Sequence, residues 1–400
     1  MRIAFLTTEF TSEPDFSGGL ANYLLRTSRA LQQSGHQPEV FCISGSNETI
    51  AHDGIPVHRV HPTPPLWIRM ADRLALRSLH RPLSCLSHAL AIGRRIKAAH
   101  ARRAFDIVQA ASYRAIGLFS SPNVPLVIRI SSLEPLWRRV LDTRCTLEQK
   151  VTEQLELMAL HRSTACYAPS HMLANAIRPV LKKNVDVIRP PFTVDVEIRD
   201  RRFFETELRT TEYLLFFGTI SPLKGGVTIA ETIPSILQKY PDLQFVLIGK
   251  SQNYGGQSMI GYILQTAGPL KARVRHFDPQ PHRILYPVIQ NARGIILPSL
   301  VDNFPNTCLE AMALKQLVVG TTGSSMEELI TDGKNGFLCR PGDPNSLLAA
   351  IEKMLNLSET EANKIKQNAG QSIERLSPAL TIPPLIDFYA RTIRGTIPES

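Results

Sequence analysis

The stretch "YLLFFGTISPLKGGVTIAETIPSILQKYPDLQFVLIG", residues 213–249, contains a strand, a helix and a second strand. Residues 213–218 and 243–249 are short, continuous apolar runs, and residues 226–240 between them have a helical pattern. Continuous apolar runs bounded by helices are typical of parallel strands in a sheet that is covered on both faces. The stretch therefore predicts one β-α-β unit of a doubly wound domain.

The same alternation continues on both sides of this unit. A segment with two prolines, "VDVIRPPFTVD" at residues 185–195, separates two alternating series and indicates a domain boundary. We predict an α/β protein of two doubly wound domains, 1–195 and 196–375, with a cleft where the carboxyl ends of the strands meet. Further strands are expected at residues 3–8, 38–44, 105–110, 125–130, 165–170, 294–299 and 316–321, and further helices at 21–35, 283–292 and from Asn306.

Length and composition agree with a protein of two globular domains. The chain has 400 residues, of which 43% are hydrophobic and 20% are charged, as in ordinary globular proteins. Its six cysteines are scattered, which argues against a disulfide framework or a zinc ribbon and favours a reducing cytoplasm. No apolar run approaches the roughly 18 residues of a membrane span, so any membrane contact is expected to be peripheral.

The net charge of +10 lies entirely in the first half of the chain. Residues 1–190 carry 24 Lys+Arg against 14 Asp+Glu, and the remainder carries 21 against 21. Nine of the basic residues fall in residues 66–103. There a helix would place Arg69, Arg73 and Arg77 on one face and Trp67, Met70 and Leu74 on another, with Arg94 and Arg95 further along. Such a basic amphipathic helix suits anionic lipid or a phosphate-bearing partner; a solvated face packed on the domain is the alternative, and nucleic acid is disfavoured.

The loop after the first strand differs from a dinucleotide-binding loop. A long polar segment precedes Gly18 and Gly19, so the glycine fingerprint that follows the first strand of a dehydrogenase is missing. Gly18 and Gly19 still precede a helix, and backbone amides at its start could approach a phosphate or a sugar. A bare glycine turn is the alternative reading.

Two loops of the second domain carry charged candidates. Lys224 lies between a strand and a helix start, where a lysine can meet a diphosphate. In "PSLVDNFPNTCLEAMA", residues 298–313, Asn306 and Thr307 can start a helix whose free amides favour an anion. Glu310, one turn further, could accept hydrogen bonds from ribose, and Asp302 could hold hydroxyls of a second group. Each acid alone has a structural alternative, as a helix-start charge or an Asx turn.

This ordered set of residues resembles the retaining glycosyltransferases of family 4. The resemblance rests on two acids eight positions apart within residues 298–338, and on "FFGTISPLKGG", "LQFVLIG", "APS" at 168–170, "IRPPFTVD" and the opening "RIAFLTTEF" with "SGGLANYLLRTSRALQQSGH". It implies the GT-B architecture of two Rossmann-like domains, with residues 376–400 forming a helix that returns to the first. It also implies a nucleotide-diphosphate-sugar donor held mainly by the second domain and an acceptor held mainly by the first.

The resemblance assigns roles to individual residues. Lys224 would bind the diphosphate, Glu310 the ribose and Asp302 the sugar hydroxyls. The expected catalytic and donor-binding set is Gly18, Gly19, Thr219, Lys224, Asp302, Asn303, Phe304, Pro305, Asn306, Thr307 and Glu310, with Glu328 matching a further glutamate of the family. Trp67, Arg69, Arg73, Arg77, Arg94 and Arg95 are candidates for contact with a membrane or the acceptor.

The sequence departs from the family pattern in three places. The acid at Asp302 is more often a glutamate, and Thr219 stands where an arginine is common. The histidine often found near the acceptor is missing from the loops of the first domain, which offer Gln109, Ser112, Tyr113, Ser131 and Ser132. The acceptor-side catalytic group is therefore left unassigned, with Glu9 and Glu134 as candidates. His58 and His61 are read as surface residues and not as metal ligands.

The predicted activity is transfer of a sugar from a UDP- or GDP-sugar, with retention, to an anionic glycan or lipid-linked acceptor in the synthesis of surface polysaccharide or glycolipid. No Asp-x-Asp pair is present, so we expect no metal and no cofactor. The expected location is cytoplasmic, at the inner face of the membrane. A catalytically silent nucleotide-sugar binder and a sugar-nucleotide epimerase of the same fold are the alternatives.

Overall fold

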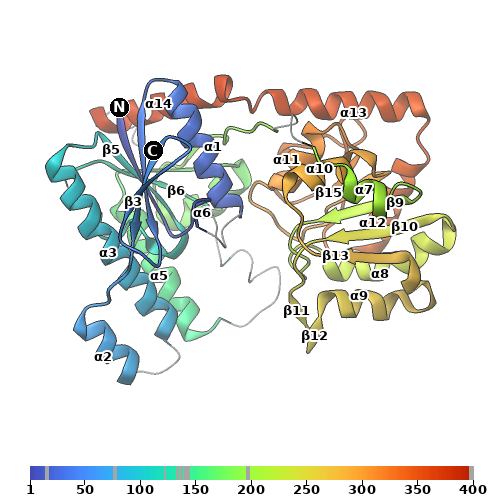
Figure 1. Cartoon of the computed structure of the whole chain (residues 1–400), viewed down its shortest axis with the longest axis horizontal. Coiled ribbons are helices and arrows are strands. Elements are labelled where there is room, and N and C mark those ends of the chain that lie inside the picture. Colours follow the sequence, from blue (N-terminus) through green and yellow to red (C-terminus); the bar gives the residue numbers. More distant parts are fainter. Residues whose placement is uncertain are drawn as a thin grey trace. The chain divides into compact units, whose positions relative to one another are not determined.

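Figure 1 shows the computed structural model of the chain, which forms two compact units. The first unit consists of Met1–Pro191 and Leu376–Ser400, and the second of Phe192–Arg375. The structure describes residues 1–13, 18–74, 79–120, 123–131, 135, 138, 145–194 and 199–395.

The first unit is built on an eight-stranded sheet in the order β3-β4-β2-β1-β5-β6-β7-β8. β3 is antiparallel to β4, and the other neighbours are parallel. Because β2 and β5 lie on opposite sides of β1, the strand order reverses between β1 and β5. The strands are β1 (Arg2–Thr7), β2 (Gln37–Ile43), β3 (Thr49–His52), β4 (Ile55–Val60), β5 (Ile107–Ala111), β6 (Leu126–Arg129), β7 (Ala165–Ala168) and β8 (Asp186–Val187).

Helices cover both faces of this sheet, because alternate side chains of β1 pack against two different sets of helices. Ile3 and Phe5 belong to the hydrophobic cluster that contains α1 and α14. Ala4 and Leu6 point to the opposite face and pack in the cluster that contains α3, α5 and α6. The helices of this unit are α1 (Gly19–Gln33), α2 (Leu66–Leu74), α3 (His80–Arg102), η2 (Tyr113–Ala115), α5 (Leu147–Arg162), α6 (His171–Leu181) and α14 (Pro378–Arg394).

The last helix, α14, is part of the first unit although it follows the whole second unit in the chain. Its buried residues Ile382, Leu385, Phe388 and Tyr389 lie in the same cluster as Tyr23 and Tyr167. In Figure 1 the red C-terminal helix accordingly lies among blue elements from the start of the chain. The first core is therefore completed by residues about 380 positions from its first strand.

The second unit contains a six-stranded parallel sheet in the order β13-β10-β9-β14-β15-β16. Here the strand order reverses between β9 and β14. The strands are β9 (Glu212–Phe217), β10 (Leu243–Ile248), β13 (Val274–Phe277), β14 (Gly294–Ile296), β15 (Val318–Thr321) and β16 (Phe337–Cys339), with a separate hairpin of β11 (Asn253–Tyr254) and β12 (Gln257–Ser258). The helices are α7 (Arg202–Glu207), α8 (Gly226–Lys239), α9 (Met259–Ala267), η3 (Gly268–Arg273), α10 (His282–Asn291), α11 (Asn306–Ala313), η4 (Ser325–Glu328), α12 (Pro344–Leu355) and α13 (Glu359–Glu374).

The prediction of two doubly wound parallel sheets is confirmed. Within the basic stretch at residues 66–103 the structure describes α2 up to Leu74 and α3 from His80, and residues 75–78 lie outside the described part. Arg77 lies outside the described residues. The first sheet also has an antiparallel edge strand, β3, which the sequence reading did not assign. In the part of the chain that the structure describes, no helix is long and apolar enough to cross a membrane.

Candidate functional site

Two charged residues of the second unit meet at the reversal of its strand order. Lys224 lies in the loop after β9, and Asp302 lies in the loop after β14. The Lys224 ammonium donates a hydrogen bond to Asp302 Oδ2 and forms an ion pair with it. The Asp302 side chain is 11% exposed and that of Lys224 is 34% exposed. Ligands of open parallel sheets bind at such a reversal, outside the carboxyl ends of the strands, and the sequence-predicted pair lies there.

The backbones of the two loops are also in contact. The Leu300 amide donates to the Leu223 carbonyl at 2.9 Å. Gly225 has φ +81°, and a Cβ at this position would lie 2.1 Å from the Pro298 carbonyl oxygen. Glycine is required here for both reasons, because other residues rarely adopt this φ and none has room. The close packing holds the loop of Lys224 against the loop of Asp302.

The loop of Asp302 leads into α11, which begins at Asn306 after Pro305. No side chain of the described residues caps this helix start, and the first amides of any helix have no acceptor within the helix. Thr307 lies against the end of β9, since its Cγ2 is 3.4 Å from where a Cβ of Gly218 would stand. The start of α11 therefore offers backbone donors and a positive helix end beside the lysine loop.

The Asp302 residue is held in place by its neighbours. Its Oδ1 accepts a hydrogen bond from the Asn303 amide at 3.0 Å. Its carbonyl oxygen accepts from the Ser325 hydroxyl at 2.8 Å. The carboxylate is thus anchored on one oxygen, while the other meets Lys224.

Glu310 lies on α11 and is buried, with 6% of its side chain exposed. Its Oε1 is 3.4 Å from Nε2 of His282, the first residue of α10. The His282 ring stacks on Tyr286 with 5.3 Å between ring centroids. The sequence reading missed His282 because it is 28 positions before Glu310, and only the order of strands in the sheet brings α10 and α11 together.

The remaining predicted residues of the second unit lie around this centre. Asn303 and Pro305 are buried, and Thr219 is exposed in the loop after β9. Phe304, Asn306 and Thr307 are partly exposed. Burial, with the Asp302 charge adding to it, raises the pKa of the Cys308 thiol well above its usual range, which makes this cysteine a poor nucleophile.

In the first unit, the predicted glycines lie at the start of α1. Gly18 is the residue before the helix and Gly19 is its first residue, and no side chain of the described ranges caps this start. Glu9 is nearby, since its Oε1 is 3.8 Å from where a Cβ of Gly18 would stand. Burial raises the pKa of Glu9 above its ordinary value. The other acceptor-side candidate, Glu134, and Ser132 lie outside the described residues.

The loop residues named from the sequence as acceptor candidates are not all in loops. Gln109 lies within β5 and is buried, where its side-chain oxygen accepts hydrogen bonds from the hydroxyls of Tyr167 and Tyr389. His58 is also not a plain surface residue, because it is half-buried, stacks on Phe41 and contacts Glu39 at 3.0 Å. Within the described ranges no group of three or more His, Cys, Asp or Glu is placed to hold a metal ion.

Helix α2 exposes a compact apolar surface. Leu66, Trp67 and Met70 are 69%, 54% and 52% exposed, while Ile68 is buried. Arg69 is exposed beside them; α2 includes Arg73, whose side chain lies outside the described part. On α3, Arg94 is exposed and Arg95 donates to the Thr49 hydroxyl at 3.4 Å.

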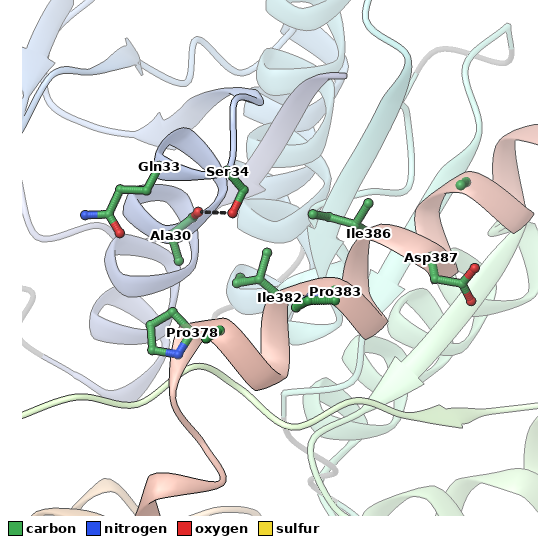
Figure 2. A pocket seen from close by; sticks show the side chains of 10 residues that line it. Ala30, Gln33, Ser34, Pro378, Ile382, Pro383, Ile386 and Asp387 are labelled. Carbon is green, nitrogen blue, oxygen red and sulfur yellow. Dashed lines mark hydrogen bonds between the residues drawn. The ribbon is translucent and has the colours of Figure 1, made fainter.

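A groove of about 680 Å³ runs between the last turns of α1 and helix α14. Figure 2 shows its lining, in which Ala30 faces Ile382 and Pro383. The Ser34 hydroxyl at its rim donates to the Ala30 carbonyl at 2.9 Å. Because the lining is mainly apolar and lies at the opposite end of α1 from Gly18, this groove is separate from the predicted site.

The fold and the site together define a class of protein: two Rossmann-like units in tandem, with a lysine, two carboxylates and an uncapped helix start at the reversal of the second sheet. Residues 198–372 match the family described as Glycosyl transferases group 1, and residues 17–196 match Glycosyltransferase Family 4. The chain therefore belongs to the GT-B glycosyltransferases, and the family predicted from its motifs is confirmed.

Individual relatives agree with this assignment. The chain is 27% identical over 187 residues to D-inositol 3-phosphate glycosyltransferase of Corynebacterium urealyticum, covering 46% of this chain and 43% of the relative. It is 23% identical over 160 residues to the capsular polysaccharide biosynthesis glycosyltransferase CapM of Staphylococcus aureus, covering 40% of each. The matches thus span less than half the length of these relatives.

Solved structures share the fold over nearly the whole chain. Sucrose-phosphate synthase of Thermosynechococcus elongatus superposes with a TM-score of 0.78 at 17% identity, covering 98% of this chain and 100% of the other. Anabaena HepE in complex with UDP-glucose superposes with a TM-score of 0.70 at 18% identity, covering 98% of this chain and 99% of the other. At these identities the likeness shows the GT-B fold.

We expect Gly225→Ala to destabilise the second unit more than Gly256→Ala does. Gly256, in the turn between β11 and β12, has nearly the same φ, +83°, but nothing lies within 4 Å of where its Cβ would stand. Both changes incur the left-handed backbone strain of about 1–2 kcal/mol, and only Gly225→Ala adds a clash with Pro298, worth about 1–3 kcal/mol more. Urea unfolding of both variants measures the difference, and equal losses would contradict the loop contact.

We expect Glu9→Gln to stabilise the protein near pH 7 and to have little effect near pH 4. Because burial raises the pKa of Glu9, the folded chain holds this proton to higher pH than the unfolded chain, so stability falls as pH rises through the folded pKa. Melting temperatures of both proteins across this pH range test the sign.

Glu13→Gln is the control of opposite sign. Burial tends to raise the pKa of Glu13, but hydrogen bonds from two serines and Arg59 outweigh it and lower the pKa. Its contribution to stability is present at neutral pH and is lost as pH falls through the folded pKa. The same direction of change in both variants would contradict the assignment for Glu9.

Proposed function

We propose that this chain transfers a glycosyl group from a UDP- or GDP-sugar to an acceptor, using the site at the reversal of the second sheet. The observation that carries this proposal is the contact between Lys224 and Asp302, with Glu310 on the helix that follows. A diphosphate supplies the anion for Lys224 and for the start of α11, and Glu310 accepts hydrogen bonds from the ribose. Binding of the donor then exchanges partners: Lys224 moves from Asp302 to the diphosphate, and Asp302 takes the sugar hydroxyls.

This arrangement suits cleavage of the bond between the sugar and the diphosphate. Negative charge grows on the leaving diphosphate in the transition state, and a fixed cation and helix amides stabilise that charge without reorganisation. The proposal needs no metal and no cofactor. We also propose that the anomeric configuration is retained. Measuring the coupling constant of the product's anomeric proton by NMR tests this.

The acceptor of this proposal is an anionic glycan or a lipid-linked acceptor, bound by the first unit. The excess of positive charge in residues 1–190 supports it. So do the names of two relatives, which describe action on an inositol phosphate and a part in capsular polysaccharide synthesis. The role proposed is assembly of surface polysaccharide or glycolipid at the cytoplasmic membrane face.

Helix α2 is proposed as the peripheral membrane contact. Its exposed Leu66, Trp67 and Met70 form one apolar surface with Arg69 beside it. Aromatic and aliphatic side chains of such a helix enter the boundary between headgroups and acyl chains, while arginine meets anionic headgroups.

We expect one nucleotide sugar to raise the melting temperature, with EDTA present, and Glu310→Ala to abolish the shift. A ligand at 100 times its dissociation constant stabilises by about 2.7 kcal/mol. Lys224→Gln should reduce the rate of transfer by at least about tenfold, because it removes a charge-assisted hydrogen bond. Glu231→Ala, which changes an exposed glutamate of α8, is the control.

Four outcomes of the thermal-shift screen and the turnover assay decide between the functions. A shift by one donor that Glu310→Ala loses and Glu231→Ala keeps supports the site. Binding without turnover would favour a silent nucleotide-sugar binder, and turnover of the donor alone, to an epimer, would favour an epimerase. No shift with any UDP- or GDP-sugar would contradict the proposal.

We expect the protein to sediment with vesicles that contain phosphatidylglycerol, and Trp67→Ser to weaken this binding by about tenfold. Burial of one large apolar side chain is worth roughly 1.5–3 kcal/mol. Leu380→Ser is the matched control, because Leu380 is 59% exposed on α14. Equal losses from both changes, or equal binding to neutral vesicles, would contradict a role for α2.

A further inference from the structure

Arg129 is a buried cation without an anion in the part of the chain that the structure describes. It is the last residue of β6 and is 8% exposed. Its guanidinium lies over the Tyr23 ring, 3.8 Å from the centroid. Among the described residues no carboxylate forms an ion pair with it, and its buried Nε has no hydrogen-bond partner. Arginine is almost never buried in this way unless it is paired.

The polar groups beneath Arg129 do not supply the missing charge. Tyr23 and Tyr167 share a hydrogen bond of 2.7 Å, and the hydroxyls of Tyr167 and Tyr389 donate to Gln109 Oε1. The Gln109 amide donates to the Tyr23 hydroxyl at 3.3 Å, so this network is satisfied internally. Burial raises the pKa of Tyr167 and of Tyr389 well above the usual range, more than Arg129 lowers it, so both phenols stay neutral.

Arg129 lies at the end of its strand, near the place where ligands of such sheets bind. Ala111 at the end of β5 is the register partner of Arg129, and β5 adjoins β1 at the reversal of strand order. Ligands of such sheets bind outside the carboxyl ends of the strands near this reversal. Tyr23, which carries the guanidinium on its ring, is on α1 one turn after its uncapped start at Gly18 and Gly19.

We propose that Arg129 binds an anionic group of the acceptor, a phosphate or a carboxylate, through its guanidinium. The inference deepens the proposed function, because it names the residue of the first unit that selects an anionic acceptor. The planar fork of arginine presents two parallel N–H groups that match the oxygens of either anion. Stacking on Tyr23 orients the guanidinium before the anion binds. The cation-π contact alone does not offset the cost of burying an unpaired guanidinium, so an anion would add stability.

The test compares anion binding by the full chain and three variants. Melting temperatures are measured at low ionic strength against inorganic phosphate and, separately, glucuronate. The variants are Arg129→Gln, Lys224→Gln and Arg29→Gln, the last removing the same charge from a 49% exposed side chain on α1. Lys224→Gln reports any phosphate that binds at the donor site.

We expect the wild type and Arg29→Gln to be stabilised by at least one anion, and Arg129→Gln to bind it about ten to a hundred times more weakly. Without anions, Arg129→Gln should melt no lower than the wild type, because it removes an unpaired buried charge. The inference is overturned if Arg129→Gln responds to both anions as the wild type does, if neither anion stabilises the wild type, or if only Lys224→Gln loses the response. A lower melting temperature of Arg129→Gln with its anion response intact would make Arg129 purely structural.

Titrations of the same proteins with UDP and GDP show whether the anion that Arg129 binds belongs to the acceptor or to the donor. Unchanged nucleotide affinity in Arg129→Gln assigns the anion to the acceptor, as proposed, and a tenfold loss would overturn that assignment in favour of the donor diphosphate. If no nucleotide binds to any protein, the proposed function fails, while the response to phosphate and glucuronate still decides whether Arg129 holds an anion.

Discussion

The packing of the loop after β9 against the loop after β14 is the contact on which the proposed site depends. Gly225 lets one backbone approach the Pro298 carbonyl, and the bond from the Leu300 amide to the Leu223 carbonyl joins the two loops. These contacts exist because β9 and β14 are neighbours at the reversal of strand order. Lys224 and Asp302, 78 positions apart, meet as a consequence.

The sequence predicts those features of the fold that depend on neighbouring residues, and it does not predict those that depend on distant ones. Continuous apolar runs are local, so β9, α8 and β10 lie within a residue or two of where the sequence places them. Strand order is not local, and the meeting of His282 with Glu310 depends on it. In the basic stretch the helical spacing of the arginines agrees with α2 as far as Leu74, and Arg77 lies outside the described residues.

The candidate site was predictable where function constrains a local motif. Lys224, Asp302 and Glu310 each lie in a loop or helix start whose sequence carries the family pattern, although the roles drawn from that pattern remain predictions. Arg129 carried no such signal, because an arginine at the end of an apolar strand reads as a residue leaving the sheet for solvent. Only burial and the absence of a partner among the described residues distinguish it.

The two units hold their central cations in different states. In the second unit Lys224 already has an internal anion, so a ligand must displace Asp302 and gains only the difference between two ion pairs. In the first unit Arg129 has no such competitor among the described residues, so an anion would recover most of the interaction that the guanidinium lost on leaving water. This cation also depends on the end of the chain, because Tyr389 of α14 completes the hydrogen bonds of the Gln109 network beneath it. The last helix therefore sets the surroundings of Arg129 through this hydrogen bond and through the packing of its apolar side chains.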